Sequence, residues 1–158
     1  MNPAAADATP PATSSATRPD CVLGFDYGAR RIGVAVGNRF TCGARPLGII
    51  ANRDDSPDWT AIDALVAEWR PGALVVGLPL TLDGEEQATS RAARAFAAAL
   101  EKRYNLAAHL ADERLSSVEA GRRFAARRAA GTARRKHAAE IDAVAAEIIT
   151  ETWLAHSS

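Results

Sequence analysis

Apolar residues near the start of the chain form three short runs that predict three strands. The runs cover residues 21–26, 32–37 and 45–51, and short polar segments separate them. Strands joined by such short turns usually pair with their neighbours in the chain. We therefore expect an antiparallel meander of three strands.

Beyond this meander the apolar residues adopt helical spacing. Between Ser56 and Trp69 they recur every three or four positions, and Ser56-Pro57 supplies an N-cap followed by a first-turn proline. Pro71-Gly72 ends this predicted helix. The continuous apolar run at residues 73–78 then predicts a strand that is buried on both faces.

The second half of the chain continues to alternate between helices and strands. A helix is predicted to begin at Asp83, where Glu86 completes a capping box, and a short strand follows at residues 106–110. Two more helices are predicted, one from Ser116 and one at about residues 139–154. This order predicts an α/β fold, in which a mixed sheet of three antiparallel meander strands and then parallel strands is flanked by helices.

Composition limits the folded part of the chain to one domain. The 158 residues suit a single hydrophobic core, and 47% of them are apolar. Residues 1–20 are rich in Ala, Pro, Ser and Thr and carry no large apolar residue after Met1. Such a segment buries too little surface to offset its ordering entropy, so we expect a disordered tail at 1–20 and a folded domain at 21–156.

Cysteine usage and hydropathy favour a protein of the cytoplasm. The two cysteines, Cys21 and Cys42, form no CxxC motif, which favours free thiols in a reducing compartment. No apolar run approaches the roughly 20 residues that a membrane span needs, and the N-terminus has no secretory signal pattern. We therefore expect a cytoplasmic protein with no membrane partner.

Three acidic residues stand at the ends of predicted elements. Asp26 ends the first strand, Glu113 follows the last strand, and Asp142 lies in the first turn of the final helix. Carboxylates at strand ends can converge at one edge of a sheet, and oxygen ligands of this kind suit Mg²⁺ or Mn²⁺. Two such ions could polarise a phosphodiester, generate the nucleophile and stabilise the leaving oxygen. These acids are therefore the candidate catalytic and metal-binding residues.

Each acid also has a simpler interpretation. Asp26 precedes Tyr27-Gly28 and could be a turn residue, while Glu113 could form a surface ion pair with its neighbours. Asp142 could complement the positive end of the helix dipole. The apolar residues around Asp142 favour a functional role, because an aspartate on a solvent-facing helix surface usually has polar neighbours.

Charge segregation indicates a polyanionic partner. The net charge of the whole chain is zero, yet residues 114–136 hold eight basic residues and one acid, a net charge of +7. Such a segment is typical of phosphate-backbone binding, and a solvated helix face is the alternative. The candidate nucleic-acid-binding residues are Arg30, Arg31, Arg114, Arg122, Arg123, Arg127 and Lys136.

Four segments, in order along the chain, resemble the motifs of the YqgF family. They are residues 22–36, which contain Gly24-Phe25-Asp26-Tyr27-Gly28; residues 75–84, with Gly77-Leu78-Pro79; residues 112–120, which open with Asp112-Glu113-Arg114; and residues 136–146, with Lys136 and Asp142. The family is described both as Holliday junction resolvase-like and as a family of pre-16S rRNA nucleases. The resemblance covers about residues 21–155.

The resemblance implies a ribonuclease H-like fold and divalent-metal cleavage of a phosphodiester. It also implies catalytic acids at Asp26, Glu113 and Asp142, and a role at the 5′ end of 16S rRNA precursors in the cytoplasm. Related true junction resolvases carry a second aspartate one helical turn after the final-helix aspartate, where this chain has Ala145. They also carry an acid after the fourth strand, where this chain has Gly77-Leu78-Pro79. These departures favour RNA over branched DNA as the substrate.

The leading hypothesis is an endonuclease with pre-16S rRNA as its partner and one or two Mg²⁺ or Mn²⁺ ions as its cofactors. Lys136 and Arg114 would neutralise phosphate charge near the site. The alternatives are a Holliday junction resolvase and a non-catalytic nucleic-acid-binding factor of the same fold. A nucleotide-binding fold of the actin and sugar-kinase type is disfavoured, because it needs two domains and this chain offers one. A monomer would suit a single RNA cut, whereas a weak homodimer would suit a junction.

Overall fold

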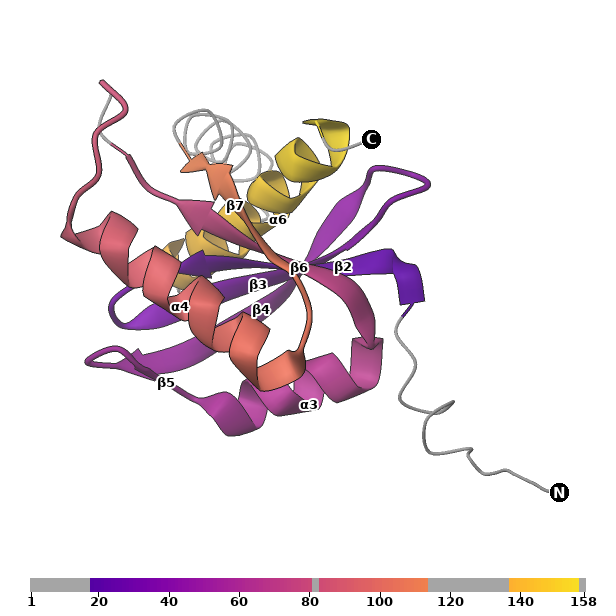
Figure 1. Cartoon of the computed structure of the whole chain (residues 1–158), viewed down its shortest axis with the longest axis horizontal. Coiled ribbons are helices and arrows are strands. Elements are labelled where there is room, and N and C mark those ends of the chain that lie inside the picture. The colour runs from indigo at the N-terminus through magenta and orange to yellow at the C-terminus, as the bar shows by residue number, and fades with distance from the viewer. Residues whose placement is uncertain (1–17, 81–82, 114–136, 157–158) are drawn as a thin grey trace, which may run out of the picture.

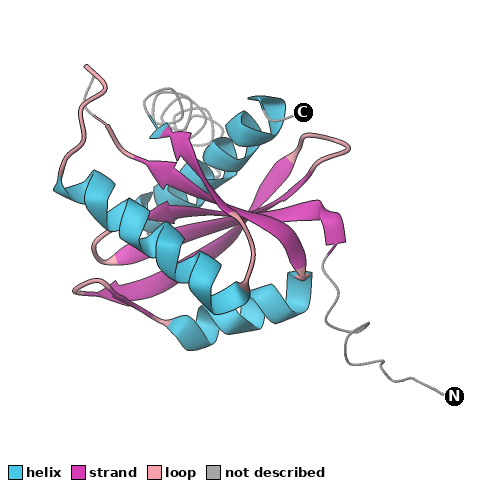
Figure 2. Ribbon diagram, in the orientation of Figure 1, coloured by secondary structure: helices cyan, strands magenta, loops and turns pink. Residues whose placement is uncertain are grey.

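The computed structural model describes residues 18–80, 83–113 and 137–156, and within 137–142 it describes the backbone alone. Figures 1 and 2 show a sheet with helices on both of its faces. None of the described helices is both long enough and apolar enough to span a membrane. In chain order the elements are β2 (Arg18–Tyr27), β3 (Arg31–Asn38), β4 (Ala44–Arg53), β5 (Ser56–Pro57), α3 (Trp59–Trp69), β6 (Pro71–Leu78), α4 (Ala88–Tyr104), β7 (Ala108–Asp112) and α6 (His137–His156).

The described strands form one mixed sheet in the order β5-β4-β3-β2-β6-β7. β2, β3 and β4 pair antiparallel as neighbours in the chain, which confirms the predicted meander. β6 joins the other side of β2 in parallel, and β7 joins β6 in parallel. The predicted mixed sheet is thus confirmed, and β2 lies between its antiparallel and parallel halves.

The two faces of the sheet are covered by different helices. α3 and α4 lie on one face, and α6 lies on the other (Figure 1). Successive side chains of a strand point to opposite faces. In β2, Leu23 and Phe25 pack in the larger core with α3 and α4, whereas Val22 packs with Leu154 of α6. By the same alternation, Gly24 and Asp26 belong to the α6 face.

α6 crosses the sheet at very short range. A Cβ atom at Gly24 would overlap Thr150 Oγ1 and lie 3.0 Å from Thr150 Cβ, and one at Gly37 would lie 2.9 Å from Leu154 Cδ1. Glycine at both positions lets the helix approach the strands this closely. Thr150 lies over Gly24 and Leu154 packs with Val22, so α6 runs antiparallel to β2. The first turns of α6 therefore lie toward the Asp26 end of the sheet.

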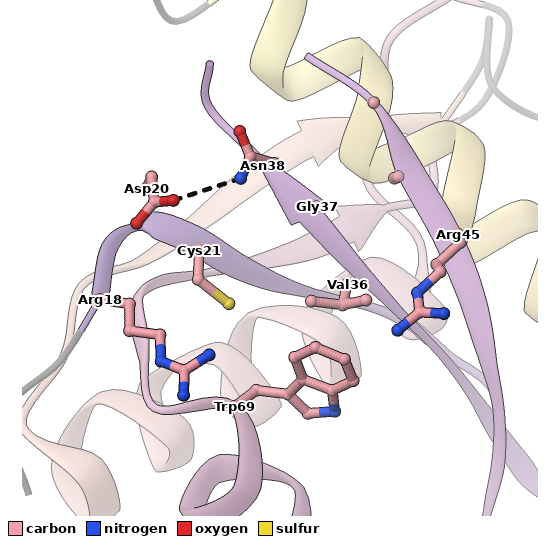
Figure 3. Close-up of a pocket in the computed structure, with 10 residues that line it drawn as sticks. Arg18, Asp20, Cys21, Val36, Gly37, Asn38, Arg45 and Trp69 are labelled. Atoms are coloured by element: carbon pink, nitrogen blue, oxygen red, sulfur yellow. Dashed lines mark hydrogen bonds between the residues drawn. The ribbon is translucent and has the colours of Figure 1, made fainter. Parts of the chain in front are cut away.

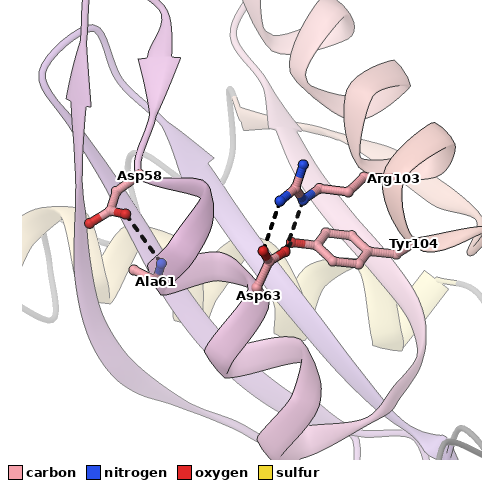
Figure 4. Close-up of polar contacts among 5 residues, drawn as sticks. All are labelled: Asp58, Ala61, Asp63, Arg103 and Tyr104. Atoms are coloured by element: carbon pink, nitrogen blue, oxygen red, sulfur yellow. Dashed lines mark hydrogen bonds and ion pairs between the residues drawn. The ribbon is translucent and has the colours of Figure 1, made fainter.

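A polar contact joins α3 to α4 (Figure 4). The carboxylate of Asp63 accepts hydrogen bonds from Arg103 Nε at 2.8 Å and Nη2 at 2.7 Å, and also from the Tyr104 hydroxyl. The Arg103 hydrogen bond, followed by that of Tyr104, lowers the pKa of Asp63 to about 2. The Arg103 guanidinium carbon also lies 5.0 Å from the ring centroid of Trp59. Arg103 therefore contacts α3 through an ion pair with Asp63 and a cation–π interaction with Trp59.

The predicted start of the first helix is wrong. Ser56-Pro57 pairs with the end of β4 as β5, across a tight turn at Asp54-Asp55, where both φ angles are positive at 51° and 61°. The N-cap of α3 is Asp58, whose side chain accepts a hydrogen bond from Ala61 N at 3.2 Å. Ser56 and Pro57 belong to this hairpin, so they cannot cap the helix.

The predicted start of the second helix is also wrong. α4 begins after the N-cap Gln87, and not at Asp83. Ser90 Oγ accepts a hydrogen bond from Gln87 N at 2.9 Å, which satisfies a backbone donor at this end. Glu86 forms an isolated bridge with Leu80, so the chain before residue 87 is extended and cannot continue the helix.

Three smaller differences concern boundaries. β2 begins at Arg18, within the segment predicted to be a tail, because Arg18 N donates to Arg70 O at 2.6 Å at the end of α3. β7 covers residues 108–112 in place of the predicted 106–110, so Glu113 follows it directly. α6 begins at His137, and the helix predicted from Ser116 lies outside the described residues.

Candidate active site

Asp26 lies at the carboxyl end of β2, on the face of the sheet that α6 covers. It is half-buried, and its partner across the ladder is Gly33 of β3. Tyr27, the next residue, points to the other face, where its ring lies 4.8 Å from that of Phe96. Since β2, β6 and β7 are parallel, their carboxyl ends meet at one edge of the sheet. Asp26 therefore lies where the two neighbouring strands also end.

Glu113 follows β7 and meets Asp26 at this edge. Gly77 of β6 pairs with Ala111, two residues before Glu113, so β6 lies between the strands of the two acids. A Cβ atom at Gly77 would lie 2.5 Å from Glu113 Oε2 and 2.6 Å from Ile149 Cδ1. The Glu113 carboxyl group therefore lies over Gly77, beside α6. From this position it hydrogen-bonds to the Asp26 side chain.

Burial and like charge both act on Glu113. Burial raises the pKa of its carboxyl group well above the ordinary value, and the charge and hydrogen bond of Asp26 raise it further. Glu113 Oε2 is buried and has no hydrogen-bond partner among the described residues. A buried carboxylate oxygen without a donor, next to a second carboxylate, is costly for the protein alone. Such settings are concentrated at functional sites.

The chemistry of this pair fits a divalent cation. Adjacent carboxylates offer the hard oxygen ligands that Mg²⁺ and Mn²⁺ prefer. A cation would also give Glu113 Oε2 the positive partner that the described residues do not provide. Within residues 18–80, 83–113 and 143–156, no three His, Cys, Asp or Glu side chains gather closely enough to hold a metal ion. A complete site would therefore need at least one ligand in addition to Asp26 and Glu113.

Asp142, the third predicted acid, belongs to α6. Its backbone lies in the first turns of the helix, which the antiparallel crossing brings toward the Asp26 end of the sheet. Its side chain lies outside the described residues, so its part in the site stays a prediction.

Comparison with known proteins identifies the family. The sequence model of a family described as "RuvX: Holliday junction resolvase" matches residues 20–156. The chain belongs to the RuvX (YqgF) family. A relative from Xanthomonas campestris pv. campestris (strain B100) is 53% identical over 142 residues, which cover 89% of this chain and 92% of the relative. A relative from Xanthomonas oryzae pv. oryzae (strain PXO99A) is 54% identical over 134 residues, covering 85% and 86%, and both are named "Putative pre-16S rRNA nuclease".

A solved structure has the same fold as this RuvX family member. It is described as "T. thermophilus RuvC in complex with Holliday junction substrate", and it matches with a TM-score of 0.51. The match covers 87% of this chain and 96% of that chain at 15% sequence identity. At this identity the likeness concerns the fold alone, and it confirms the predicted ribonuclease H-like fold.

A buried asparagine supports the turn after Asp26. Asn52 of β4 donates from Nδ2 to Gly28 O at 2.6 Å, and its backbone N donates to Arg30 O at 2.9 Å. Its side chain is only 3% exposed, so the turn is held from the interior of the protein. Sequence reasoning did not identify Asn52, because it directly follows a predicted strand and looks like an ordinary turn residue.

Basic residues flank the same edge of the sheet. Arg30 and Arg31, both predicted to bind nucleic acid, are exposed just after Asp26. Arg53, which the sequence did not single out, lines an open hollow of about 510 Å³ together with Arg30, Asn52 and the acids Asp54 and Asp55. The other predicted nucleic-acid-binding residues lie outside the described residues: Arg114, Arg122, Arg123, Arg127 and Lys136. The described part of this RuvX family member thus combines paired carboxyl groups with arginines that can bind phosphate.

Proposed function

We propose that this RuvX family member is a divalent-metal-dependent endonuclease that hydrolyses a phosphodiester during 5′-end maturation of the 16S rRNA precursor. The observation that carries the proposal is the buried contact between the Asp26 and Glu113 carboxyl groups at an arginine-flanked sheet edge. The name shared by the Xanthomonas relatives supports the RNA substrate. Free thiols at Cys21 and Cys42 agree with a cytoplasmic location.

Asp26, Glu113 and Asp142 are the proposed ligands of one or two Mg²⁺ or Mn²⁺ ions. When bound, such ions polarise the phosphodiester and lower the pKa of the attacking water. The hydrogen bond between the Asp26 and Glu113 carboxyl groups needs one proton, since two ionised carboxylates have no donor. Release of that proton frees both groups to act as ligands.

The arginines of the site bind and orient the substrate. Arg30 and Arg31 would hold phosphate oxygens, because a guanidinium group can donate two parallel hydrogen bonds to one phosphate. Asn52 is a positioning residue, since it fixes the backbone at Gly28 and Arg30. Together these groups would place the scissile phosphate beside the paired carboxyl groups.

Holliday junction cleavage is the second candidate function. The name of the matching family and the description of the RuvC structure favour it. Ala145 and Gly77 count against it, because junction resolvases have acids at or near these places. The Glu113 carboxyl group also occupies the space that a side chain at residue 77 would need.

The substrate is tested by incubating the full chain with a 16S precursor RNA that keeps its 5′ leader, in Mg²⁺ or in EDTA, and mapping the 5′ ends. A four-way DNA junction serves as the parallel substrate. We expect a Mg²⁺-dependent cut that shortens the leader and no resolution of the junction. Cleavage of the junction alone would select the second candidate. RNA binding without any cut would identify a non-catalytic binding factor.

A further inference from the structure

A cavity lies at the end of the sheet opposite to Asp26 (Figure 3). Its volume is about 380 Å³, and it lies between the start of β2, the hairpin from β3 to β4, and the end of α3. The buried Cys21 and Val36 are among its lining residues, together with Arg18, Arg45 and Trp69. This volume falls in the range of sites that hold a small ligand, about 300–1,000 Å³.

The arginines of this cavity are available to an anion. Arg18 and Arg45 are exposed, and neither forms a salt bridge within the described part of the chain. Asp20 is the one acid among the described lining residues, and its carboxylate accepts a hydrogen bond from Asn38 Nδ2 at 3.2 Å. The lining therefore carries a net positive charge.

Trp69 lines the cavity with the guanidinium group of Arg45 over its ring. It is the last residue of α3, and the guanidinium carbon of Arg45 lies 5.3 Å from its ring centroid. Figure 3 shows Arg18 and Arg45 on opposite sides of Trp69. A nucleobase stacks on an aromatic ring or on a guanidinium plane, and a phosphate pairs with a guanidinium group. The cavity offers both kinds of group to one nucleotide.

The hairpin that borders the cavity carries an exposed aromatic ring. Phe40 is 86% exposed, and the guanidinium carbon of Arg39 lies 5.1 Å from the ring centroid of Trp153. Asn38 orders the hairpin, because its Oδ1 accepts hydrogen bonds from Phe40 N at 2.8 Å and Thr41 N at 3.1 Å. A phenyl ring that is exposed on an ordered turn, beside arginines, suits the stacking of an unpaired base.

We infer that this cavity and the Phe40 hairpin bind unpaired nucleotides of the RNA strand that flanks the cleavage site. The inference rests on the proposed function, since it assigns a second contact to the same substrate. Arg18 and Arg45 bind phosphates, while Trp69 and Phe40 stack bases. Arg18 and Asp26 lie at opposite ends of β2, eight positions apart, so roughly 25 Å separates Arg18 from the paired carboxyl groups.

A single strand fits this surface better than a duplex or a protein. The bases of a duplex are stacked on one another, so they cannot reach a ring inside a cavity, whereas unpaired bases can be splayed onto aromatic side chains. A protein partner would usually cover a contiguous apolar patch. Among the described residues, Phe40 and Ile49 are the exposed large hydrophobic side chains, and Ile49 does not line the cavity.

The test is the affinity of the full chain for a labelled single-stranded RNA, measured by fluorescence anisotropy in EDTA so that no cut occurs. For an RNA that spans both ends of the sheet, Arg18→Gln/Arg45→Gln is expected to raise Kd about tenfold or more. For this double variant, the slope of log Kd against log salt concentration should be smaller than that of the wild type by about one to two. Phe40→Ala should raise Kd about fivefold or more through lost stacking. Arg91→Gln, at an exposed arginine of α4 outside the cavity, is the matched control and should leave Kd unchanged.

Two further measurements distinguish failure of this inference from failure of the proposed function. For a short RNA that reaches only the Asp26 end of the sheet, every variant is expected to have the same Kd as the wild type. Unchanged affinity of both cavity variants for the long RNA would overturn the inference, even if the wild type cleaves that RNA. Absence of cleavage in Mg²⁺ would contradict the proposed function and leave the binding result intact.

Free AMP distinguishes a strand-binding site from a mononucleotide site. Competition by AMP that Arg18→Gln/Arg45→Gln abolishes, together with unchanged RNA affinity, would overturn the assignment to RNA. Thermal melts establish that each variant folds. If the arginine variant does not fold, Phe40→Ala decides the question, because it changes a side chain that is 86% exposed.

Discussion

At the residue scale, the candidate site depends on the space that Gly77 leaves for Glu113. A Cβ atom at residue 77 would lie 2.5 Å from Glu113 Oε2 and 2.6 Å from Ile149 Cδ1. A side chain there would displace either the carboxyl group from Asp26 or α6 from the sheet. Gly77 therefore contributes to the paired carboxyl groups although it has no functional group of its own.

Replacement of Gly77 by alanine is expected to lower kcat for RNA cleavage by about tenfold to a hundredfold, because it displaces the Glu113 carboxyl group. Overpacking should also cost about 1–3 kcal/mol of unfolding free energy. Single-turnover kinetics and urea denaturation measure the two effects. Gly43→Ala is the matched control for the unfolding free energy, since its Cβ would make one contact, at 3.4 Å from Thr41 Oγ1. Wild-type kcat in a folded Gly77→Ala protein would contradict the placement of Glu113.

Sequence reasoning could single out Asp26 and Glu113 because each is a carboxylate at, or shortly after, the end of a predicted apolar strand. It could not single out Asn52 or assign Gly77 its role, because each acts through a residue that is distant in the sequence and lies just beyond the end of another strand. Asn52 is 24 residues from its partner Gly28, and Gly77 meets Glu113 across β6 and β7. Such contacts depend on strand register, which the pattern of apolar residues does not specify.

At the element scale, α6 and the sheet are coupled through Gly24 and Thr150. The Thr150 hydroxyl donates to Ala146 O at 2.7 Å, and Gly24 leaves room for it. Gly24→Ala should lower the unfolding free energy by about 2–3 kcal/mol through overpacking. Thr150→Ala removes the overlapping oxygen, so the double variant should be at least about 1 kcal/mol more stable than the sum of the two single effects predicts. Strictly additive effects in urea denaturation would contradict this contact.

The contact of Asp63 with Arg103 predicts a pH dependence of stability. The pKa of Asp63 in the folded protein is about 2, below its ordinary value of 3.8. A lowered folded-state pKa means that the stabilisation is present above the ordinary pKa and is lost as pH falls toward 2. Asp63→Asn should therefore lower the melting temperature by a few degrees at neutral pH, and this difference should shrink steadily below about pH 4.

Glu68→Gln is the control for that experiment, because Glu68 is an exposed acid on the same helix. The melting temperature of the Glu68→Gln variant should equal that of the wild type at every pH. A difference between Asp63→Asn and the wild type that is independent of pH would show that the Asp63 contact is not electrostatic.

The middles of the elements could be predicted and several of their ends could not. Apolar spacing identifies the strands and helices because burial in the core determines it. The ends depend on local polar contacts that have more than one solution. Ser56-Pro57 could cap a helix or close a hairpin, and the Asp54-Asp55 turn selects the hairpin. Gln87 replaces Asp83 as the cap of α4 because Glu86 is held in an extended bridge.

At the scale of the whole molecule, the topology could be predicted because short connections favour an antiparallel meander and helical connections favour parallel strands. The cavity at the far end of the sheet could not be predicted from the sequence. It combines Arg18 of β2, Arg45 of β4 and Trp69 of α3, which come together only when three separate segments have folded. Its residues carry no motif that would mark them in the sequence.

Binding of a cation should stabilise the whole protein. At about a hundredfold excess of Mn²⁺ over Kd, the stabilisation is about 2.7 kcal/mol, which corresponds to a rise of roughly 5–10 °C in melting temperature. Asp26→Asn and Glu113→Gln should each abolish most of this rise, because each removes a proposed ligand. An equal rise in these variants and in the wild type would place the cation elsewhere.

In the proposed mechanism, Asp26 and Glu113 act as one catalytic unit. The most direct test is the single-turnover cleavage rate of leader-containing 16S precursor RNA in saturating Mg²⁺, for Asp26→Asn, Glu113→Gln and the double variant. Each single variant should lose at least about a hundredfold in rate, and the double variant should be no slower than the slower single variant, because paired residues fail together. Glu68→Gln should cleave at the wild-type rate. A wild-type rate in either Asp26→Asn or Glu113→Gln would show that the pair is not the catalytic unit.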